Sequence, residues 1–268
     1  MRLLTFDIED YHRLLDIPGL IEQYDESKSI VVSETQNILD ILKKNKVKAI
    51  FFVLGEVAAK FPNVVRSIVA DGHALGTHSH KHILHKDLSD NQFVDDLRQS
   101  INAIESVSGT KVRCYRAPGF SLQKEYFYRY SLMKAEGIDF DFSLFDGVAS
   151  HGGVDMGNVQ NLPLRFETSF GDVESYPFKK SSAFGFSLPI LGGGYFRLSP
   201  TWLISRVLRS HGYIMTYFHP RDFSLEQPRL KNLSLIRYFK AYVGLRGASQ
   251  KLNKLVGSNE WSGVEKFK

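Results

Sequence analysis

The sequence predicts an α/β protein with a mainly parallel sheet, either open or closed into a barrel. Short apolar runs alternate along the chain with longer amphipathic ones, which is the β/α rhythm of parallel sheets. The chain has 268 residues, 43% hydrophobic side chains and nine prolines, enough to bury one sizeable core. We therefore expect a single domain.

The expected elements follow one another in regular alternation. Strands are expected at residues 3–8, 48–54, 74–77, 112–116, 140–144, 173–176 and 213–218. Helices are expected at residues 33–44, 56–70, 89–107 and 200–210. Such alternation favours right-handed crossovers between parallel strands.

The pattern breaks between Phe145 and Pro200, where the sequence is rich in Gly, Ser and Phe and includes Gly192-Gly193-Gly194. Backbone freedom matters more than side-chain packing in such sequence. We interpret this region as elaborated loops on the same domain.

The chain is basic from Arg229 onward, and we expect its apolar residues to dock on the body as one face. These residues are Leu230, Leu233, Leu235 and Ile236. The expected division is therefore a main domain over 1–228 and a C-terminal extension packed on it over 229–268.

Composition limits the classes of function. The net charge of +5, from 34 basic and 29 acidic residues, is compatible with an ordinary solvated surface, and the basic tail contains no recognised nucleic-acid motif. Peripheral contact of this tail with a membrane surface stays open. The single cysteine, Cys114, excludes an intrachain disulfide and is expected to be buried. We find neither a secretory signal nor a membrane span and expect a cytoplasmic protein.

Three acids lie within four residues at the end of the first expected strand: Asp7, Glu9 and Asp10. Like charges this close repel one another unless a cation or hydrogen-bond donors intervene. Residues 7 and 9 of a strand point to the same side, so both can face one site while Asp10 turns into the loop. A solvated strand end or a helix-capping acid is the alternative.

Four of the nine histidines lie within eight residues, at positions 78, 80, 82 and 85. His78 and His82 stand four apart, so in a helix or a tight turn their imidazoles converge and can bind a divalent metal. Two imidazoles and a carboxylate suit zinc, and cobalt, nickel or iron fit the same set.

Two further segments follow expected strands. Arg116-Ala117-Pro118-Gly119-Phe120 lies where βα loops gather functional groups, and Arg116 is placed to orient a carboxylate such as Asp7. Tyr217-Phe218-His219-Pro220 ends the last expected strand, and its aromatic residues suggest a partly desolvated His219. Together with the acids and histidines, these segments indicate a metal-dependent hydrolase with a carboxylate base and a histidine acid.

The order of these segments resembles the polysaccharide deacetylases of carbohydrate esterase family four. The four matching segments are Phe6-Asp7-Ile8-Glu9-Asp10, His78-Ser79-His80-Lys81-His82, Arg116-Ala117-Pro118-Gly119-Phe120 and Phe218-His219-Pro220. The resemblance implies a distorted (β/α) barrel and N-deacetylation of an amino sugar in a bacterial glycan or its lipid- or nucleotide-linked precursor.

The resemblance also implies residue roles. Asp7 corresponds to the catalytic base and His219 to the general acid, with Arg116 and Asp141 in support. His78 and His82 correspond to metal ligands, and Glu9 or Asp10 supplies the carboxylate. Substrate contacts are expected from Phe120 and Tyr195.

The acidic segment departs from the family, which usually has two adjacent aspartates followed by glycine. Asp7-Ile8-Glu9-Asp10-Tyr11 and Gly192-Gly193-Gly194-Tyr195-Phe196-Arg197 are similar to the subgroup linked to bacterial exopolysaccharide and surface-glycan biosynthesis. A catalytically inactive glycan-binding relative and a hydrolase of another small amide or ester remain alternatives. The sequence leaves the sugar, the acyl group and the oligomeric state open.

Overall fold

The computed structural model describes residues 1–13, 24–147, 151–157, 162–183, 186–210, 212–230 and 233–268. The chain forms two compact units that interleave in sequence. The first unit contains Met1–Lys48 and Ser181–Ser262. The second unit contains Ala49–Lys180 and Gly263–Lys268.

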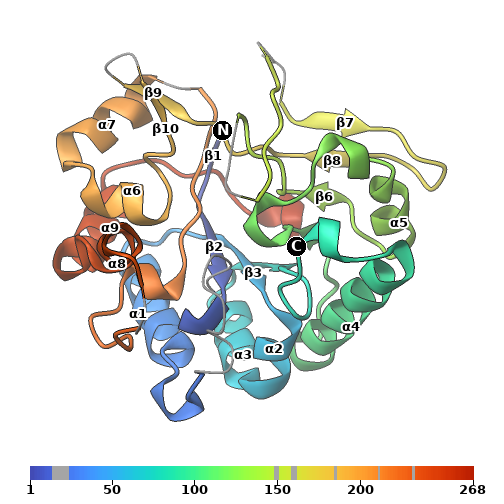
Figure 1. Cartoon of the computed structure of the whole chain (residues 1–268), viewed down its shortest axis with the longest axis horizontal. Helices are drawn as coiled ribbons and strands as arrows, with labels where there is room; N and C mark the ends of the chain where they lie inside the picture. Colours follow the sequence, from blue (N-terminus) through green and yellow to red (C-terminus); the bar gives the residue numbers. More distant parts are fainter. Residues whose placement is uncertain (14–23, 148–150, 158–161, 184–185, 211, 231–232) are drawn as a thin grey trace. The chain divides into compact units, whose positions relative to one another are not determined.

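The second unit is built on a mostly parallel sheet with strand order β3-β4-β5-β6-β8-β7. Figure 1 labels β3, β6, β7 and β8 of this sheet. Its strands are β3 (Ile50–Val53), β4 (Ala74–Thr77), β5 (Cys114–Tyr115), β6 (Phe140–Asp141), β7 (Leu164–Phe166) and β8 (Val173–Ser175). Only β7 pairs antiparallel among these described strands. Every residue of β3 and β4 is buried, as expected for parallel strands covered on both faces.

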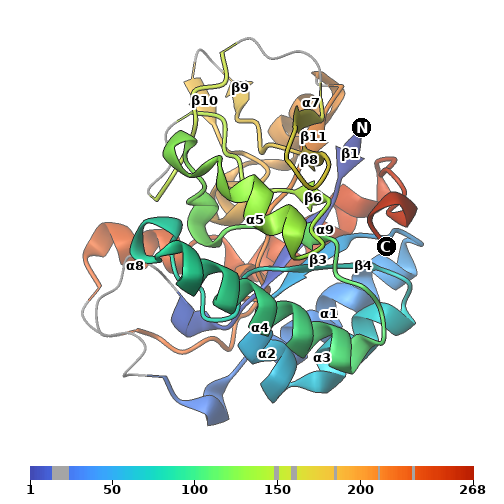
Figure 2. The same cartoon turned by 90° about the vertical axis from the view of Figure 1, so that its right-hand side faces the viewer.

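Four helices accompany this sheet in the described part of the second unit. They are α2 (Gly55–Lys60), α3 (Pro62–Ala70), α4 (Asp90–Ser108) and α5 (Arg129–Ala135). Helices α2, α3 and α4 pack against one another (Figure 2). Helix α4 begins with a capping box between Ser89 and Gln92 and ends at Gly109, whose φ of 67° is the left-handed conformation typical of a helix terminus.

The prediction of a single helix over 56–70 is wrong. Two helices, α2 and α3, occupy this range and meet at Phe61. Pro62 at the start of α3 explains the break. A proline lacks the backbone N–H that would continue α2, but it fits the first turn of a new helix.

In the first unit, the start of the chain pairs with a segment about 210 residues later. Strand β1 (Arg2–Leu3) pairs in parallel with β11 (Ile214–Met215). Strand β2 (Thr5–Ile8) continues this direction, since Phe6 bridges to Phe218 and the backbone N–H of Asp7 donates to the carbonyl of Phe218 at 2.8 Å. This pairing brings the acidic residues at the end of β2 beside His219.

The remaining elements of the first unit are mostly helical. The helices are α1 (Val31–Lys44), α6 (Gly193–Leu198), α7 (Thr201–Ser210), α8 (Leu235–Tyr242) and α9 (Ala248–Gly257), and strand β9 (Ser181–Ala183) pairs antiparallel with β10 (Phe186–Leu188). The region 145–200, expected to be loops, thus contains β7, β9, β10 and α6 as well as the expected strand β8.

The prediction that Leu235 and Ile236 dock the C-terminal extension on the body is wrong. Their side chains are 89% and 70% exposed, whereas Leu252, Leu255 and Val256 of α9 are buried. Amphipathic sequence identifies an apolar face of a helix but not what covers that face. Docking of the extension therefore occurs through α9, and the division at residue 228 remains a prediction.

The α/β fold class and the mostly parallel sheet are confirmed. Cys114 is confirmed as a buried residue of β5, with a thiol pKa raised by burial. Within the described ranges, every helix is too short or too polar to cross a bilayer.

Candidate active site

The acidic residues at the end of β2 are buried in the first unit: Asp7 is 2% exposed, Glu9 4% and Asp10 2%. Asp10 has local partners for both carboxylate oxygens. Its Oδ1 accepts from the backbone N–H groups of Tyr11 and Ile30 at 2.8 and 3.2 Å, and its Oδ2 accepts from the hydroxyl of Tyr24 at 3.1 Å. Asp10 therefore fixes the backbone around the site.

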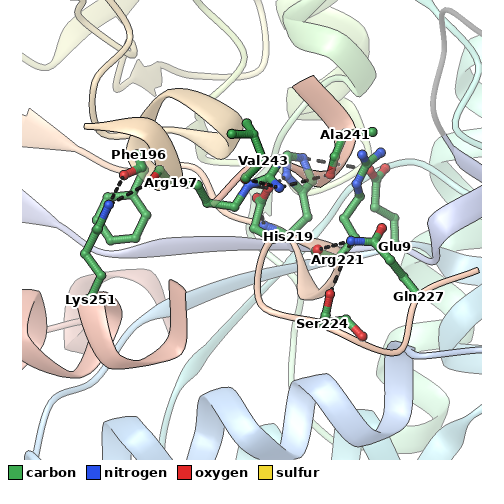
Figure 3. A network of polar contacts seen from close by, with 11 residues as sticks. Glu9, Phe196, Arg197, His219, Arg221, Ser224, Gln227, Ala241, Val243 and Lys251 are labelled. Atoms are coloured by element: carbon green, nitrogen blue, oxygen red, sulfur yellow. Dashed lines mark hydrogen bonds and ion pairs between the residues drawn. The ribbon is translucent and has the colours of Figure 1, made fainter. Parts of the chain in front are cut away.

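Asp7 and Glu9 face the same imidazole. The Nε2 of His219 lies 3.8 Å from Asp7 Oδ2 and 3.8 Å from Glu9 Oε1, and Figure 3 shows Glu9 and His219 in this arrangement. Asp7 belongs to β2, and Glu9 lies just past the end of this strand. The carboxylates of Asp7 and Glu9 and the imidazole of His219 thus lie together at the end of β2.

Asp222, which the sequence analysis missed, orients His219. Its Oδ2 accepts hydrogen bonds from the backbone N–H of His219 at 3.0 Å and from the ring Nδ1 at 3.1 Å. A carboxylate acceptor requires a proton on Nδ1, so Nε2 is the nitrogen that faces the two acids. The short 3₁₀ turn Pro220–Asp222 creates this contact by returning the chain onto His219.

Arg197 holds the other oxygen of Asp222. The Nε of Arg197 lies 3.3 Å from Asp222 Oδ1, and both side chains are almost fully buried. Its Nη1 donates to the carbonyls of Ala241 and Val243 at 2.9 and 3.0 Å (Figure 3). Helix α6, which begins within the glycine-rich segment, therefore places a buried arginine beside the carboxylate that orients His219.

Two glycines of that segment are required by geometry. A Cβ on Gly192 would lie 1.9 Å from the ring of Tyr217, so no larger residue fits there. Gly193, which begins α6, has a φ of +44°, a conformation that L-residues with side chains rarely adopt. At the other end of α6, the Nζ of Lys251 donates to the carbonyls of Phe196, Arg197 and Ser199.

The surrounding charges keep His219 protonated in the metal-free protein. Burial alone lowers the pKa of this imidazole, but the hydrogen bond to Asp222 and the charges of Glu9, Asp222 and Asp7 outweigh burial and raise it to about 9. For Asp222, burial is again the largest opposing effect, and His219, Arg197 and Arg221 lower its pKa to about 2. The pair is therefore ionic at neutral pH.

In the second unit, the histidine motif forms a bent loop after β4. His78 and His82 are 2% and 7% exposed, their ring centroids lie 5.0 Å apart, and one nitrogen of each ring lies within 4.8 Å of the other. The Nδ1 of His78 donates to the carbonyl of Arg116 at 2.8 Å, which leaves Nε2 as the lone-pair donor. Such an outer hydrogen bond is typical of a metal-binding histidine.

Helix α4 holds this loop in a strained conformation. The carboxylate of Asp96 accepts from the backbone N–H groups of His80 and Lys81 at 2.7 and 3.1 Å, and the hydroxyl of Ser100 donates to the carbonyl of Ser79 at 2.9 Å. Ser79 and His82 have φ values of 72° and 59°. Left-handed conformations at residues other than glycine cost free energy and concentrate at functional sites.

Arg116 and Phe120 lie at the end of the neighbouring strand β5. Arg116 is fully buried, its Nε donates to the carbonyl of Phe142 at 3.3 Å, and its guanidinium lies 4.2 Å from the ring centroid of Phe52. Phe120 has a φ of 54° and is 8% exposed, with its ring packed against Phe145. Tyr195 of the first unit, the other residue expected to contact substrate, is 41% exposed.

Asp141 is a buried carboxylate with several hydrogen bonds in the second unit. Its Oδ2 accepts from the hydroxyls of Tyr130 and Ser175 at 2.9 and 2.6 Å, and its Oδ1 accepts from the backbone N–H of Ser143 at 3.1 Å. Burial raises its pKa against the opposing effect of these donors. These bonds join α5, β6 and β8.

Residues 3–137, half of the chain, match the sequence model of the family described as polysaccharide deacetylase. The chain belongs to the polysaccharide deacetylase family. Residues 143–268 match a second model, described as a domain of unknown function, DUF3473. The first three motif segments of the resemblance lie in the deacetylase region. The fourth segment, which contains His219, lies in the second matched region.

Curated deacetylases are similar to part of the chain. A peptidoglycan-N-acetylglucosamine deacetylase of Bacillus cereus is 34% identical over 31% of this chain and 30% of its own length. A chitin deacetylase of Colletotrichum lindemuthianum is 34% identical over 39% of this chain and 43% of its own length. The chain thus spans less than half the length of these polysaccharide deacetylases.

Solved structures share the fold over nearly the whole chain. A putative polysaccharide deacetylase from Mycobacterium smegmatis has a TM-score of 0.61 at 18% identity and covers 98% of this chain and 87% of its own. A family 4 carbohydrate esterase pseudoenzyme from Bacillus anthracis has a TM-score of 0.55 at 17% identity, covering 100% of this chain and 64% of its own. At these identities the similarity establishes the polysaccharide deacetylase fold.

Proposed function

We propose that this protein is a metal-dependent N-deacetylase that acts on an N-acetylated amino sugar of a bacterial glycan, or on its lipid- or nucleotide-linked precursor. We further propose that it belongs to the subgroup linked to exopolysaccharide and surface-glycan biosynthesis. The observation that carries the proposal is the orientation of His219: Asp222 holds its Nδ1, and its Nε2 faces Asp7 and Glu9 at 3.8 Å. Family membership and the deacetylase relatives support it.

The proposed metal ligands are His78 and His82 with one carboxylate. The hydrogen bond from His78 Nδ1 to the Arg116 carbonyl and the short distance between the two imidazoles suit a shared divalent cation. We favour Glu9 over Asp10 as the carboxylate, because the oxygens of Asp10 already accept three hydrogen bonds. Two imidazoles and one carboxylate favour zinc, and cobalt, nickel and iron fit the same donors.

The proposed reaction is hydrolysis of an acetamide. A bound divalent metal lowers the pKa of water and polarises the amide carbonyl. Asp7 removes a proton from the attacking water, and His219 protonates the leaving nitrogen. The carboxylate of Asp222, which accepts the hydrogen bond from Nδ1, stabilises the protonated imidazole that this second step needs.

The remaining proposed roles concern position. Asp222 keeps the His219 ring in one orientation, and Arg197 keeps Asp222 ionised. Arg116 is proposed to orient Asp7, and Asp141 remains the residue that the family resemblance assigns to the support of His219. Tyr195 and Phe120 are proposed to contact the sugar, Tyr195 with an exposed aromatic face.

The test is acetate release from a panel of N-acetylated nucleotide sugars, lipid-linked sugars and short glycans, each with and without chelator. We expect acetate release from at least one amino sugar, and we expect the chelator to suppress this release. If the metal-loaded protein instead hydrolyses only O-acetyl esters or non-sugar amides, the substrate class is wrong. If it binds metal and sugar but releases no acyl group from any of them, it is an inactive glycan-binding relative.

A further inference from the structure

Helix α8 (Figure 1) belongs to the first unit, and several of its large apolar side chains are exposed. Leu235 is 89% exposed, Ile236 70%, Tyr238 41% and Phe239 55%. Leu235, Tyr238 and Phe239 stand at positions i, i+3 and i+4 and therefore share one face of the helix. Single exposed apolar residues are common, but four within one short helix indicate a surface that contacts something apolar.

The other side of α8 is anchored, so this exposure is a fixed feature of the unit. Ala241 is 7% exposed, and its carbonyl accepts the hydrogen bond from buried Arg197. The hydroxyl of Tyr242 donates to the carbonyl of Pro228 at 2.8 Å and accepts from the backbone N–H of Leu230 at 2.8 Å. The C-terminal turn thus faces the protein, and the N-terminal turn carries the apolar side chains outward.

The charged residues of the sequence that contains α8 have one sign. Residues 227–259 include seven Lys and Arg residues and no Asp or Glu. Arg237 is exposed within α8, beside the apolar side chains, and Arg246 is exposed just after the helix. Contact between two copies through this surface would place these cations together without counter-charges, which disfavours self-association.

We propose that α8 docks on a membrane surface that contains anionic phospholipid. Leu235, Ile236 and Phe239 enter the boundary between headgroups and acyl chains, while Arg237 and the neighbouring basic residues bind lipid phosphates. A short helix with bulky apolar side chains on one side and cations around it has the composition of an interfacial helix. This proposal concerns attachment of the protein and does not depend on the reaction at His219.

Co-sedimentation with lipid vesicles tests the proposal on the full chain. We expect binding to phosphatidylcholine vesicles containing about a third phosphatidylglycerol, weaker binding to pure phosphatidylcholine, and loss of binding as salt is raised. Phe239→Ser and Leu235→Ser should each weaken binding about tenfold, and Arg237→Glu should weaken it only on anionic vesicles.

Matched substitutions at other exposed positions separate the helix from general effects of composition. Phe170, Leu225 and Arg66 are exposed outside α8, with 61% exposure for Phe170 and 58% for Leu225. Phe170→Ser, Leu225→Ser and Arg66→Glu should leave vesicle binding unchanged. The substituted side chains of α8 are in solvent, so circular dichroism should show all variants folded.

Three results would overturn the proposal. The first is no binding of the wild-type protein to anionic vesicles. The second is equal binding by the α8 variants and their controls. The third is a concentration-dependent dimer in sedimentation velocity that Leu235→Ser abolishes, because it would assign the surface to a second copy of the chain.

Discussion

The carboxylate of Asp222 accepts two hydrogen bonds from one residue, His219, through the backbone N–H at 3.0 Å and the imidazole Nδ1 at 3.1 Å. The contact fixes both the position and the tautomer of the ring. It also leaves Nε2 directed at Asp7 and Glu9.

Removal of the imidazole tests whether His219 is the general acid. His219→Ala should lower turnover about 100- to 10,000-fold with a thermal unfolding transition still present. Asp222→Asn should lower kcat less than His219→Ala does and leave KM nearly unchanged, because the ring remains but loses its charged acceptor. Steady-state kinetics and differential scanning calorimetry measure both. Loss of the thermal transition in His219→Ala would make the residue structural.

Metal content tests the assignment of the two histidine ligands. His78→Ala and His82→Ala should each lose bound metal in elemental analysis, because each removes one of the proposed donors. His80→Ala is the matched control, since His80 lies in the same loop and its backbone N–H, not its ring, binds Asp96. Stoichiometric metal in both ligand variants would contradict the assigned site.

Substitutions at Asp7, Glu9 and Asp10 should have three different effects. Glu9→Gln should weaken metal binding, whereas Asp10→Asn should mainly lower stability, because Asp10 accepts hydrogen bonds from Tyr11, Ile30 and Tyr24. Asp7→Asn should keep the metal and stop turnover. We would measure metal stoichiometry, turnover and thermal stability for all three variants. These measurements distinguish Glu9 as metal ligand, Asp10 as structural anchor and Asp7 as catalytic base. Full activity of Asp7→Asn would assign the base to another residue.

Buried His85 should make the protein less stable in mild acid. Burial, aided by the charge of Arg129, lowers the pKa of His85 from 6.5 to about 3 in the folded state. The unfolded chain therefore binds a proton below about pH 6.5 that the folded chain does not, so stability falls as pH decreases through that range. Between about pH 7 and pH 5, this residue should lower the free energy of unfolding by about 2 kcal/mol.

Urea unfolding at several pH values measures this effect in the wild type and in His85→Gln. The variant loses the hydrogen bond between His85 Nε2 and the hydroxyl of Tyr115, so its absolute stability will differ. The comparison therefore uses the change in unfolding free energy with pH. Identical pH slopes for both proteins below pH 6.5 would show that His85 titrates alike in the folded and unfolded chains.

Several elements were predictable because the signal is local. A run such as Ile50–Val53 is apolar throughout because both faces of the strand are covered, and it appears in the structure as β3. The motif segments were also predictable, since His78 and Arg116 directly follow strands β4 and β5. The carboxyl ends of parallel strands are where an α/β fold collects functional side chains.

The missed features depend on contacts between distant segments. Arg197 reaches Asp222 only because α6 is held by Gly192 against Tyr217 and by Lys251 of α9. An aspartate three residues after a histidine otherwise indicates no more than a cap of a short helix. The exposure of Leu235 was likewise hidden, because periodicity defines a helix face without identifying its neighbour.

Metal reconstitution of the 268-residue chain tests the central claim most directly. Chelator-treated protein is titrated with zinc while acetate release from its best amino-sugar substrate is measured. We expect no acetate release without metal, and a linear rise in release that ends at a single equivalent of zinc per chain. Acetate release that persists in metal-free protein, or that does not return when metal is bound, would contradict a metal-dependent deacetylase.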